Sequence, residues 1–301
     1  MVLSSYMEQK QKFKTTITSK HKLFDLHLKE TFKYRDLIWL FVKRDFTALY
    51  KQTILGPLWA IIQPVLTTFV FSFIFGSLAG LATADIPGTF NVPSFLFYMT
   101  GTMLFTYFST NVNKVSKIFI ENRATMGKVY YPRLVQPISA SLSNLIPFII
   151  NFVLFVSVWA IFLITGTTSM QVTWWLLFIP LVVLELIVLS IGLGMIISAV
   201  TTKYRDLQML VGFGLQLWQY ASPIAYGLTL ISLSPTWGDR LMFYTCINPL
   251  TPIVTTFRYA MFGFGYFNWI PYVVSWGISI FFFFVGLMLF SKTEKNFMDT
   301  I

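Results

Sequence analysis

The chain has 301 residues, of which 55% are hydrophobic and 11% are charged, and its net charge is +10. Soluble domains average roughly 45–50% apolar and about 25% charged residues, so this composition excludes both a soluble globular domain and a disordered chain. It favours an all-α protein that crosses a membrane several times. The single cysteine, Cys246, also excludes a disulfide framework and a cysteine metal cluster.

The N-terminal part of the chain is strongly basic. Residues 1–32 lack the continuous apolar stretch of a signal peptide, and we predict a cytosolic tail that is either solvated or bound to anionic lipid, the first being favoured. In residues 33–51 apolar side chains recur near the helical period, among charged ones. This pattern predicts a basic amphipathic helix in the membrane interface rather than a plain extension of the first span.

Six apolar segments follow, each long enough to cross a bilayer as a helix. They are residues 54–82, 95–118, 137–164, 174–200, 207–229 and 270–290. The loops on one side of this topology, together with the ends of the spans that meet them, hold 20 of the 22 Lys and Arg residues. Because basic loops stay on the cytoplasmic side, both termini are predicted to be cytoplasmic.

One further apolar stretch, residues 241–257, does not fit as a span. It is 17 residues long and contains Pro249 and Pro252, which would break so short a helix. A seventh span would also move the C-terminus outside, against the charge distribution. We therefore predict that residues 230–269 form an external segment that dips back into the membrane, where irregular backbone must be buried in protein or line a wet cavity.

The sequence contains no G-x-x-x-x-G-K-[ST] phosphate loop and no cluster of metal-ligating residues, so we expect neither an ATP site nor a metal site in this chain. The one charged residue between positions 134 and 202 is Glu185. It is either a functional carboxylate or a residue paired with backbone or a polar neighbour. We favour the second reading, since a single carboxylate makes a poor proton relay.

Five segments resemble one family, the permeases of ABC-2-type polysaccharide exporters, and most closely those that export O-antigen lipopolysaccharide. They are YKQTILGPLWAIIQP (50–64), KVYYPRLVQPISASLSNLIPF (128–148), TKYRDLQMLVGFGLQLWQYASPIAYGL (202–228), INPLTPIVTTFRYAMFG (247–263) and TEKNFMDTI (293–301). The resemblance covers residues 33–301, which it implies form one transmembrane domain after the tail.

The resemblance implies a homodimer of six-span subunits that binds two copies of a cytosolic P-loop ATPase, which would supply the ATP and Mg²⁺ site. The loop after the second span would couple to the ATPase, although its residues alone fit a basic loop with headgroup-anchored tyrosines equally well. The implied coupling residues are Glu121, Arg123, Lys128, Tyr130, Tyr131 and Arg133. The implied gate helix at 33–51 carries Arg35, Phe41, Lys43 and Arg44.

A sugar polymer would pass along the first and fifth spans, where aromatic faces can stack on sugars without binding them deeply. The candidate lining residues are Trp59, Phe71, Phe75, Phe213, Trp218, Tyr220 and Tyr226, any of which could instead serve in packing or in an interfacial belt. In the external re-entrant segment we single out Asn248, Pro249 and Arg258. Arg258 could meet a phosphate or acidic sugar, but snorkelling or a local carbonyl partner is favoured.

The predicted function is therefore that of a permease subunit without an ATPase site of its own. It would move lipid-linked polysaccharide, O-antigen first, across the bacterial inner membrane, in contact with membrane lipid and with no nucleic acid partner. A capsular polysaccharide or teichoic acid exporter is the alternative within the family. A gradient-driven transporter is disfavoured by the scarcity of charge within the spans, and a membrane enzyme is disfavoured by the lack of a shared catalytic motif.

Overall fold

The computed structural model describes residues 31, 33–51, 53–80, 92–122, 131–132, 134–166, 170–204, 206–232, 234 and 238–298. Within these residues all regular structure is helical, as predicted, and there is no strand. Apart from Thr31, the predicted basic tail at 1–32 lies outside the described residues, so its role stays a prediction.

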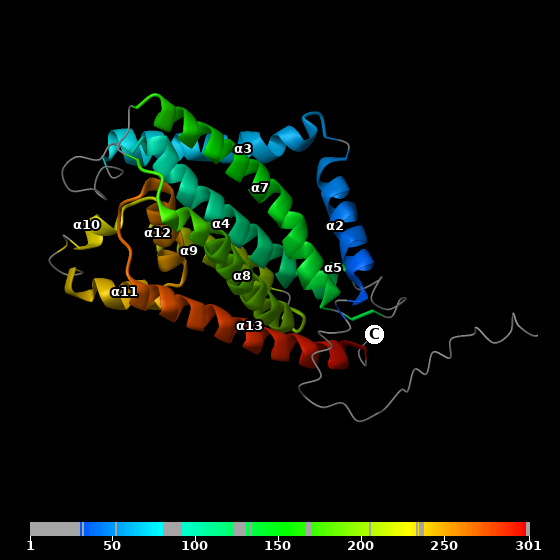
Figure 1. Ribbon diagram of the computed structural model, residues 1–301. Helices are drawn as coiled ribbons and strands as arrows, with labels where there is room; N and C mark the ends of the chain where they lie inside the picture. Colours follow the sequence, from blue (N-terminus) through cyan, green and yellow to red (C-terminus); the bar gives the residue numbers. More distant parts are fainter. Residues whose placement is uncertain are drawn as a thin grey trace, which may run out of the picture.

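Four long helices run side by side and form the body of the subunit (Figure 1). They are α4 (Ser94–Ser116), α7 (Val135–Ile164), α8 (Ile179–Thr201) and α13 (Trp269–Met298). α8 packs against both α13 and α4, while α7 packs against α4. Two further helices, α2 (Arg35–Tyr50) and α3 (Trp59–Phe71), both contact α7, and α3 also contacts α4.

Shorter elements complete the described chain. They are η1 (Gly56–Leu58), the π-helical η2 (Ser72–Leu78), α5 (Ile118–Glu121), η4 (Trp174–Phe178), α9 (Leu207–Tyr220), α10 (Leu228–Ser232), η5 (Gly238–Arg240), α11 (Leu241–Ile247) and α12 (Leu250–Phe262). The elements α10, α11 and α12 gather at one end of the bundle, whereas α2, α5 and the C-terminal end of α13 lie at the other (Figure 1). The two ends correspond to the external and cytosolic sides of the predicted topology.

Among the described residues, four stretches are long and apolar enough to cross a membrane, and they coincide with four of the six predicted spans. They are Gly56–Leu78, Val135–Ile164, Trp174–Thr201 and Trp269–Thr293. Large apolar side chains remain exposed along them, for example Phe69 at 61% and Ile161 at 59%. Such surfaces suit contact with lipid or with another protein, not with water.

The other two predicted spans differ from a plain apolar helix. α4 has 23 residues, which is long enough, but its polar residues make it less apolar than the other four, and it is buried along most of its length. α9 has only 14 residues, or about 21 Å of helix, whereas the predicted span ran from 207 to 229. It ends at Tyr220 because Pro223 lacks an amide hydrogen and disfavours helix in the residue before it.

Small residues allow the central helices to approach closely. A Cβ atom added to Gly192 on α8 would lie 2.6 Å from the backbone nitrogen of Phe283 on α13. A Cβ atom on Gly194 would lie 2.6 Å from Cβ of Val115 on α4. α8 is therefore clamped between α13 and α4 by two glycines, a common way of packing helices in membranes. In contrast, a Cβ atom at Gly212 on α9 meets nothing within 4 Å in the subunit.

A buried polar cluster ties α4 to α7 and α8. Asn111 donates from Nδ2 to Ser190 Oγ at 2.7 Å and to Ser141 Oγ at 3.2 Å. Its Oδ1 accepts from Nδ2 of Asn144 at 3.2 Å, and the hydroxyls of Tyr107 and Ser141 lie 2.8 Å apart. Hydrogen bonds of this kind between membrane helices contribute about 0.6–1.7 kcal/mol each, so the cluster fixes the register of the three helices.

The glycine contact predicts a position-specific cost of adding one methyl group. We expect Gly192→Ala to destabilise the chain by about 1–3 kcal/mol, because its methyl group would overlap backbone that cannot move without separating α8 from α13. Gly212→Ala is the matched control, with the same chemical change in open space. Thermal unfolding in mild detergent measures both, and equal midpoints for the two variants would contradict the described packing.

Candidate functional site

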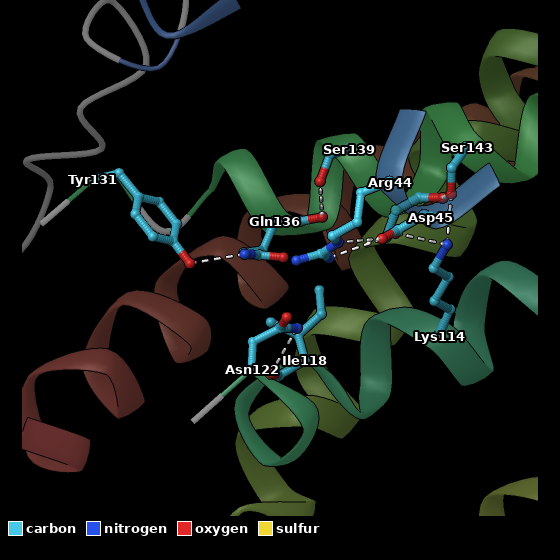
Figure 2. A network of polar contacts seen from close by, with 10 residues as sticks. Arg44, Asp45, Lys114, Ile118, Asn122, Tyr131, Gln136, Ser139 and Ser143 are labelled. Carbon is cyan, nitrogen blue, oxygen red and sulfur yellow. Dashed lines mark hydrogen bonds and ion pairs between the residues drawn. The ribbon is translucent and has the colours of Figure 1, made fainter. Parts of the chain in front are cut away.

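At the end of the bundle that is predicted to be cytosolic, a chain of charges joins α2 to the other helices (Figure 2). Asp45 on α2 lies 2.9 Å from the Nζ atom of Lys114 on α4 and 2.8 Å from the guanidinium of its neighbour Arg44. Lys114 also donates to Ser143 Oγ on α7 at 2.5 Å. The Asp45 side chain is only 13% exposed and that of Lys114 25%, so water screens this pair less than it screens a surface pair. The contacts connect three helices at one point.

An aromatic contact lies beside this charge network. Phe41 on α2 is 7% exposed and packs edge-on against Tyr131, with ring centroids 5.7 Å apart. The Tyr131 hydroxyl accepts from Nε2 of Gln136 at 2.7 Å, and the guanidinium of Arg44 lies 4.7 Å above the Phe41 ring. Tyr131 is 4% exposed, so its ring is packed against α2 inside the subunit.

The structure places the predicted coupling and gate residues as follows. Among the coupling residues, Glu121 is exposed at the end of α5 and Tyr131 is buried, while Arg123, Lys128, Tyr130 and Arg133 lie outside the described residues. On the gate helix, Phe41 faces the bundle and Arg35 and Lys43 are exposed. The helix α2 itself matches the predicted range 33–51 closely.

A pocket of about 260 Å³ opens beneath α2, between α4, α5 and α7. Its lining includes two basic residues, Arg44 and Lys114, and two acidic ones, Asp45 and Glu121. Opposite charges therefore balance in this pocket. The sequence holds one signal for this pocket, because Lys114 is the only charged residue of α4 and a partly buried lysine needs a partner of opposite charge.

At the opposite end, which is predicted to be external, Arg258 on α12 is buried, with 5% of its surface exposed. It donates from Nη1 to the carbonyl of Pro223 at 2.8 Å, from Nη2 to that of Ile224 at 3.2 Å and from Nε to Thr100 Oγ1 at 3.1 Å. Its guanidinium lies 3.7 Å from the centroid of the Phe97 ring. Of the two favoured readings, snorkelling and a local carbonyl partner, the second describes these contacts. Arg258 holds the turn after α9 against α4.

Asn248 joins the same turn to the start of α12. Its Nδ2 donates to the Ala221 carbonyl and to Ser222 Oγ, both at 3.0 Å. Its Oδ1 accepts from Nε1 of Trp218 at 2.9 Å and from the amide of Leu250 at 3.2 Å. All four hydrogen-bonding positions of one side-chain amide are therefore used, and Asn248 fixes how α9 ends and α12 begins. Pro249, the residue after it, is the N-cap of α12.

The aromatic residues predicted to line a passage divide into two groups. Trp59, Phe213 and Tyr220 are exposed in the subunit, whereas Phe71, Phe75, Trp218 and Tyr226 are partly buried by contacts with other side chains. The helices α3 and α9, which carry most of them, both pack on α4. Lining of a passage by any of these residues stays a prediction.

Glu185 is fully buried in α8, and its Oε1 lies 2.5 Å from Ser275 Oγ on α13. Of the two readings left open by the sequence, pairing with a polar neighbour is the one that describes this contact. The sequence could not identify Ser275 as the neighbour, because the two residues are 90 positions apart.

The contact between α2 and α4 predicts a coupling energy between two side chains. In a double-mutant cycle of Asp45→Asn and Lys114→Met, we expect a coupling of about 1 kcal/mol or more, since the pair is partly buried. Arg35 and Asp36 are a matched control, 3.9 Å apart with both side chains at least 85% exposed, and should show no measurable coupling. Chemical denaturation in detergent measures the free energy of unfolding of every variant in both cycles. Additive effects of the Asp45 and Lys114 substitutions would contradict a stabilising ion pair between them.

The position of Arg258 predicts that charge alone cannot replace it. Arg258→Lys should destabilise the chain by at least about 2 kcal/mol, because one ammonium group cannot reach acceptors spread around a planar fork. Arg240→Lys, at an exposed external position, should leave the unfolding midpoint unchanged. A fully stable Arg258→Lys variant would mean that the guanidinium contacts contribute little.

Comparison with known proteins places this arrangement in a family. Residues 36–262 match the profile of the ABC-2 type transporter family. The O-antigen export system permease protein RfbA of Myxococcus xanthus is 26% identical over 276 residues, or 91% of this chain and 98% of the relative. A protein of the same name from Klebsiella pneumoniae is 25% identical over 88% of this chain and 95% of the relative.

A further relative, the polysialic acid transport protein KpsM of Escherichia coli, is 28% identical over 85% of this chain and 93% of its own length. The family profile covers well over half of the chain. It includes α2, the bundle helices α4, α7 and α8, and the segment up to the end of α12, but not α13. Together with the long apolar helices, this match shows that the chain is a multi-pass membrane protein that belongs to the ABC-2 type transporter family.

Proposed function

We propose that this chain is the permease subunit of an ATP-driven exporter that carries lipid-linked O-antigen polysaccharide across the bacterial inner membrane. The observation that carries the proposal is its similarity, along 88–91% of its length, to relatives named as O-antigen export permeases. In this proposal α4 and α9 serve as the second and fifth of six spans. Both termini are cytoplasmic, and α10, α11 and α12 form the external re-entrant segment.

A second copy of the chain completes the passage in this proposal. Support comes from the apolar faces that α3 and α9 leave uncovered in the single subunit. On α9 the exposed side chains recur every three or four residues along one face: Met209, Leu210, Phe213, Leu217 and Tyr220. α3 exposes Leu66, Phe69 and Val70 in the same way. Part of each face would meet lipid and part would meet the partner copy or the polymer.

Energy would come from two copies of a cytosolic P-loop ATPase with bound ATP and Mg²⁺, since the sequence of this chain has no phosphate loop of its own. The segment from Glu121 to Arg133 would contact that partner. Force applied there would reach α2 through the packing of Tyr131 on Phe41, and would reach α4 through the Asp45–Lys114 pair. Hydrolysis in the ATPase would thereby tilt the gate helix and open a path for the glycan.

One observation suggests a second candidate substrate, namely the 28% identity to a polysialic acid transport protein. Polysialic acid is an anionic polymer, and a passage for it would gain from basic side chains. The helices α3 and α9 carry no charged residue at all. This absence supports a polymer that offers hydroxyl groups and apolar faces, so we retain O-antigen as the proposed substrate.

Transport into vesicles tests the proposal. Proteoliposomes that contain this chain and its candidate ATPase should move lipid-linked O-antigen across the bilayer only when ATP is present. Lipid-linked polysialic acid in the same assay should move poorly. Efficient movement of polysialic acid alone would favour the second substrate, and movement of either glycan without the ATPase would overturn the proposal in favour of a gradient-driven transporter.

The route of coupling predicts different outcomes for two substitutions of one residue. Tyr131→Ala removes the ring that packs on Phe41 and should lower ATP-dependent export at least tenfold. Tyr131→Phe keeps that ring and loses only the hydroxyl that accepts from Gln136, so it should export at close to the parental rate. The measurement is export per ATP hydrolysed. Equal export by both variants would rule out this contact as the route.

A further inference from the structure

The buried carboxyl of Glu185 on α8 takes no part in the proposed coupling route or in the proposed passage. It lies six residues after the start of α8, or about 9 Å along the helix, and Ser275 lies six residues after the start of α13. Both residues have no exposed surface. No Lys or Arg occurs between positions 134 and 202 or between 259 and 291, so neither α8 nor the membrane part of α13 supplies a counter-ion.

Ser275 contacts two oxygen atoms at once. Its Oγ lies 2.5 Å from Oε1 of Glu185 and 2.9 Å from the carbonyl oxygen of Pro249. A carbonyl oxygen only accepts hydrogen bonds, an ionised carboxylate only accepts, and a serine hydroxyl has a single proton to donate. With Glu185 ionised, one of the two contacts would bring two oxygen atoms together without a proton between them.

A protonated Glu185 resolves this count. Its hydroxyl donates to Ser275 Oγ, and the Ser275 hydroxyl then donates to the Pro249 carbonyl, so that each contact contains one proton. The other carboxyl oxygen, Oε2, has no hydrogen-bond partner among the residues described. An unpartnered oxygen on a neutral carboxylic acid costs far less in an apolar interior than one on a carboxylate ion.

The two hydrogen bonds connect α8 and α13 to the start of α12. Pro249 is the N-cap of α12, and its neighbour Asn248 already holds the end of α9. Two sets of hydrogen bonds therefore hold the start of α12. Asn248 connects it to α9, and Ser275 with Glu185 connects it to α13 and α8. α11 also packs on α13 directly.

We propose that Glu185 is a positioning residue that acts as a neutral hydrogen-bond donor. The chain of hydrogen bonds from Glu185 to Ser275 to the Pro249 carbonyl fixes the α11–α12 segment on the membrane-spanning helices. Its consequence for export rests on the proposed function, whereas its chemistry does not. The requirement is for a donor of the right length, not for a negative charge.

Two substitutions of Glu185 separate length from charge. Glu185→Gln keeps the length and supplies an amide donor, while Glu185→Asp keeps the carboxyl but is shorter by one methylene group. Cys246, the only cysteine, lies three residues before Pro249 and is partly exposed, so its labelling by a water-soluble maleimide in lipid nanodiscs reports the position of the segment. We expect the parental labelling rate in the Gln variant and a rate at least threefold different in the Asp variant.

Ser275→Ala and Ser279→Ala provide the matched controls. Both serines are fully buried on α13, but Ser279 has no hydrogen-bond partner among the described residues. Ser275→Ala should change Cys246 labelling as Glu185→Asp does, and Ser279→Ala should not. A parental rate in the Asp variant with an altered rate in the Gln variant would show that charge is required, and would overturn the proposal. Equal rates in all variants would overturn it too.

Infrared spectroscopy of the unsubstituted chain tests the protonation state directly and requires no variant to fold. At pH 7 in nanodiscs we expect a carbonyl stretching band of a protonated carboxylic acid that shifts when glutamate is labelled with ¹³C, since Glu185 is the only glutamate within the predicted spans. Absence of that band would overturn the proposal. Neither readout involves transport, so a failure of the proposed function would leave both unchanged.

Discussion

A bilayer interior offers no water to a buried polar group, and this constraint accounts for most of the arrangement described here. Among the described residues, a lysine, a glutamate and an arginine within the helical body each have polar partners from other helices. Lys114 pairs with Asp45 at the cytosolic end, Glu185 meets Ser275 within the bundle, and Arg258 is held by carbonyl groups at the external end. Each pairing also joins helices that are distant in sequence, so satisfying the polar group builds the tertiary structure.

The helix α4 makes polar contacts toward both of its ends, which explains why it is the most polar of the long helices. Thr100 accepts from Arg258 in the first third of the helix. Asn111 and Lys114 lie one turn apart near the other end, where Asn111 binds α7 and α8 and Lys114 reaches α2 and α7. A more apolar α4 would cross a membrane more readily alone but would lose all three connections. We infer that α4 is the element through which the two ends of the subunit are mechanically joined.

Sequence reasoning predicted the features that depend on local pattern. The all-helical class, four of the six spans and the extent of α2 follow from apolar periodicity and from the distribution of charge. Pro223 is a local signal for the early end of α9, but the absence of charged residues from 207 to 228 favoured a longer span. Helix ends depend on single residues, whereas span prediction averages over about 20.

The partners of the candidate site residues could not be predicted, because they come from remote parts of the chain. The role of Tyr131 at the ATPase partner stays a prediction, but the packing of its ring on Phe41, 90 positions earlier, had no signal in the sequence. Arg258 and Asn248 were singled out from the sequence, but their contacts with α4 and α9 depend on the packing of the whole bundle. A single amino-acid sequence, considered by itself, holds no direct signal for contacts between such distant positions.

The central claim is that this membrane subunit works only with a separate ATPase. The most direct measurement is the mass of the complex after co-expression with the candidate ATPase and solubilisation in mild detergent. The account predicts an assembly of two copies of this chain with two copies of the ATPase, stable during size-exclusion chromatography. A chain that elutes alone with every candidate ATPase would contradict the claim and would leave a transporter without an ATP-driven partner.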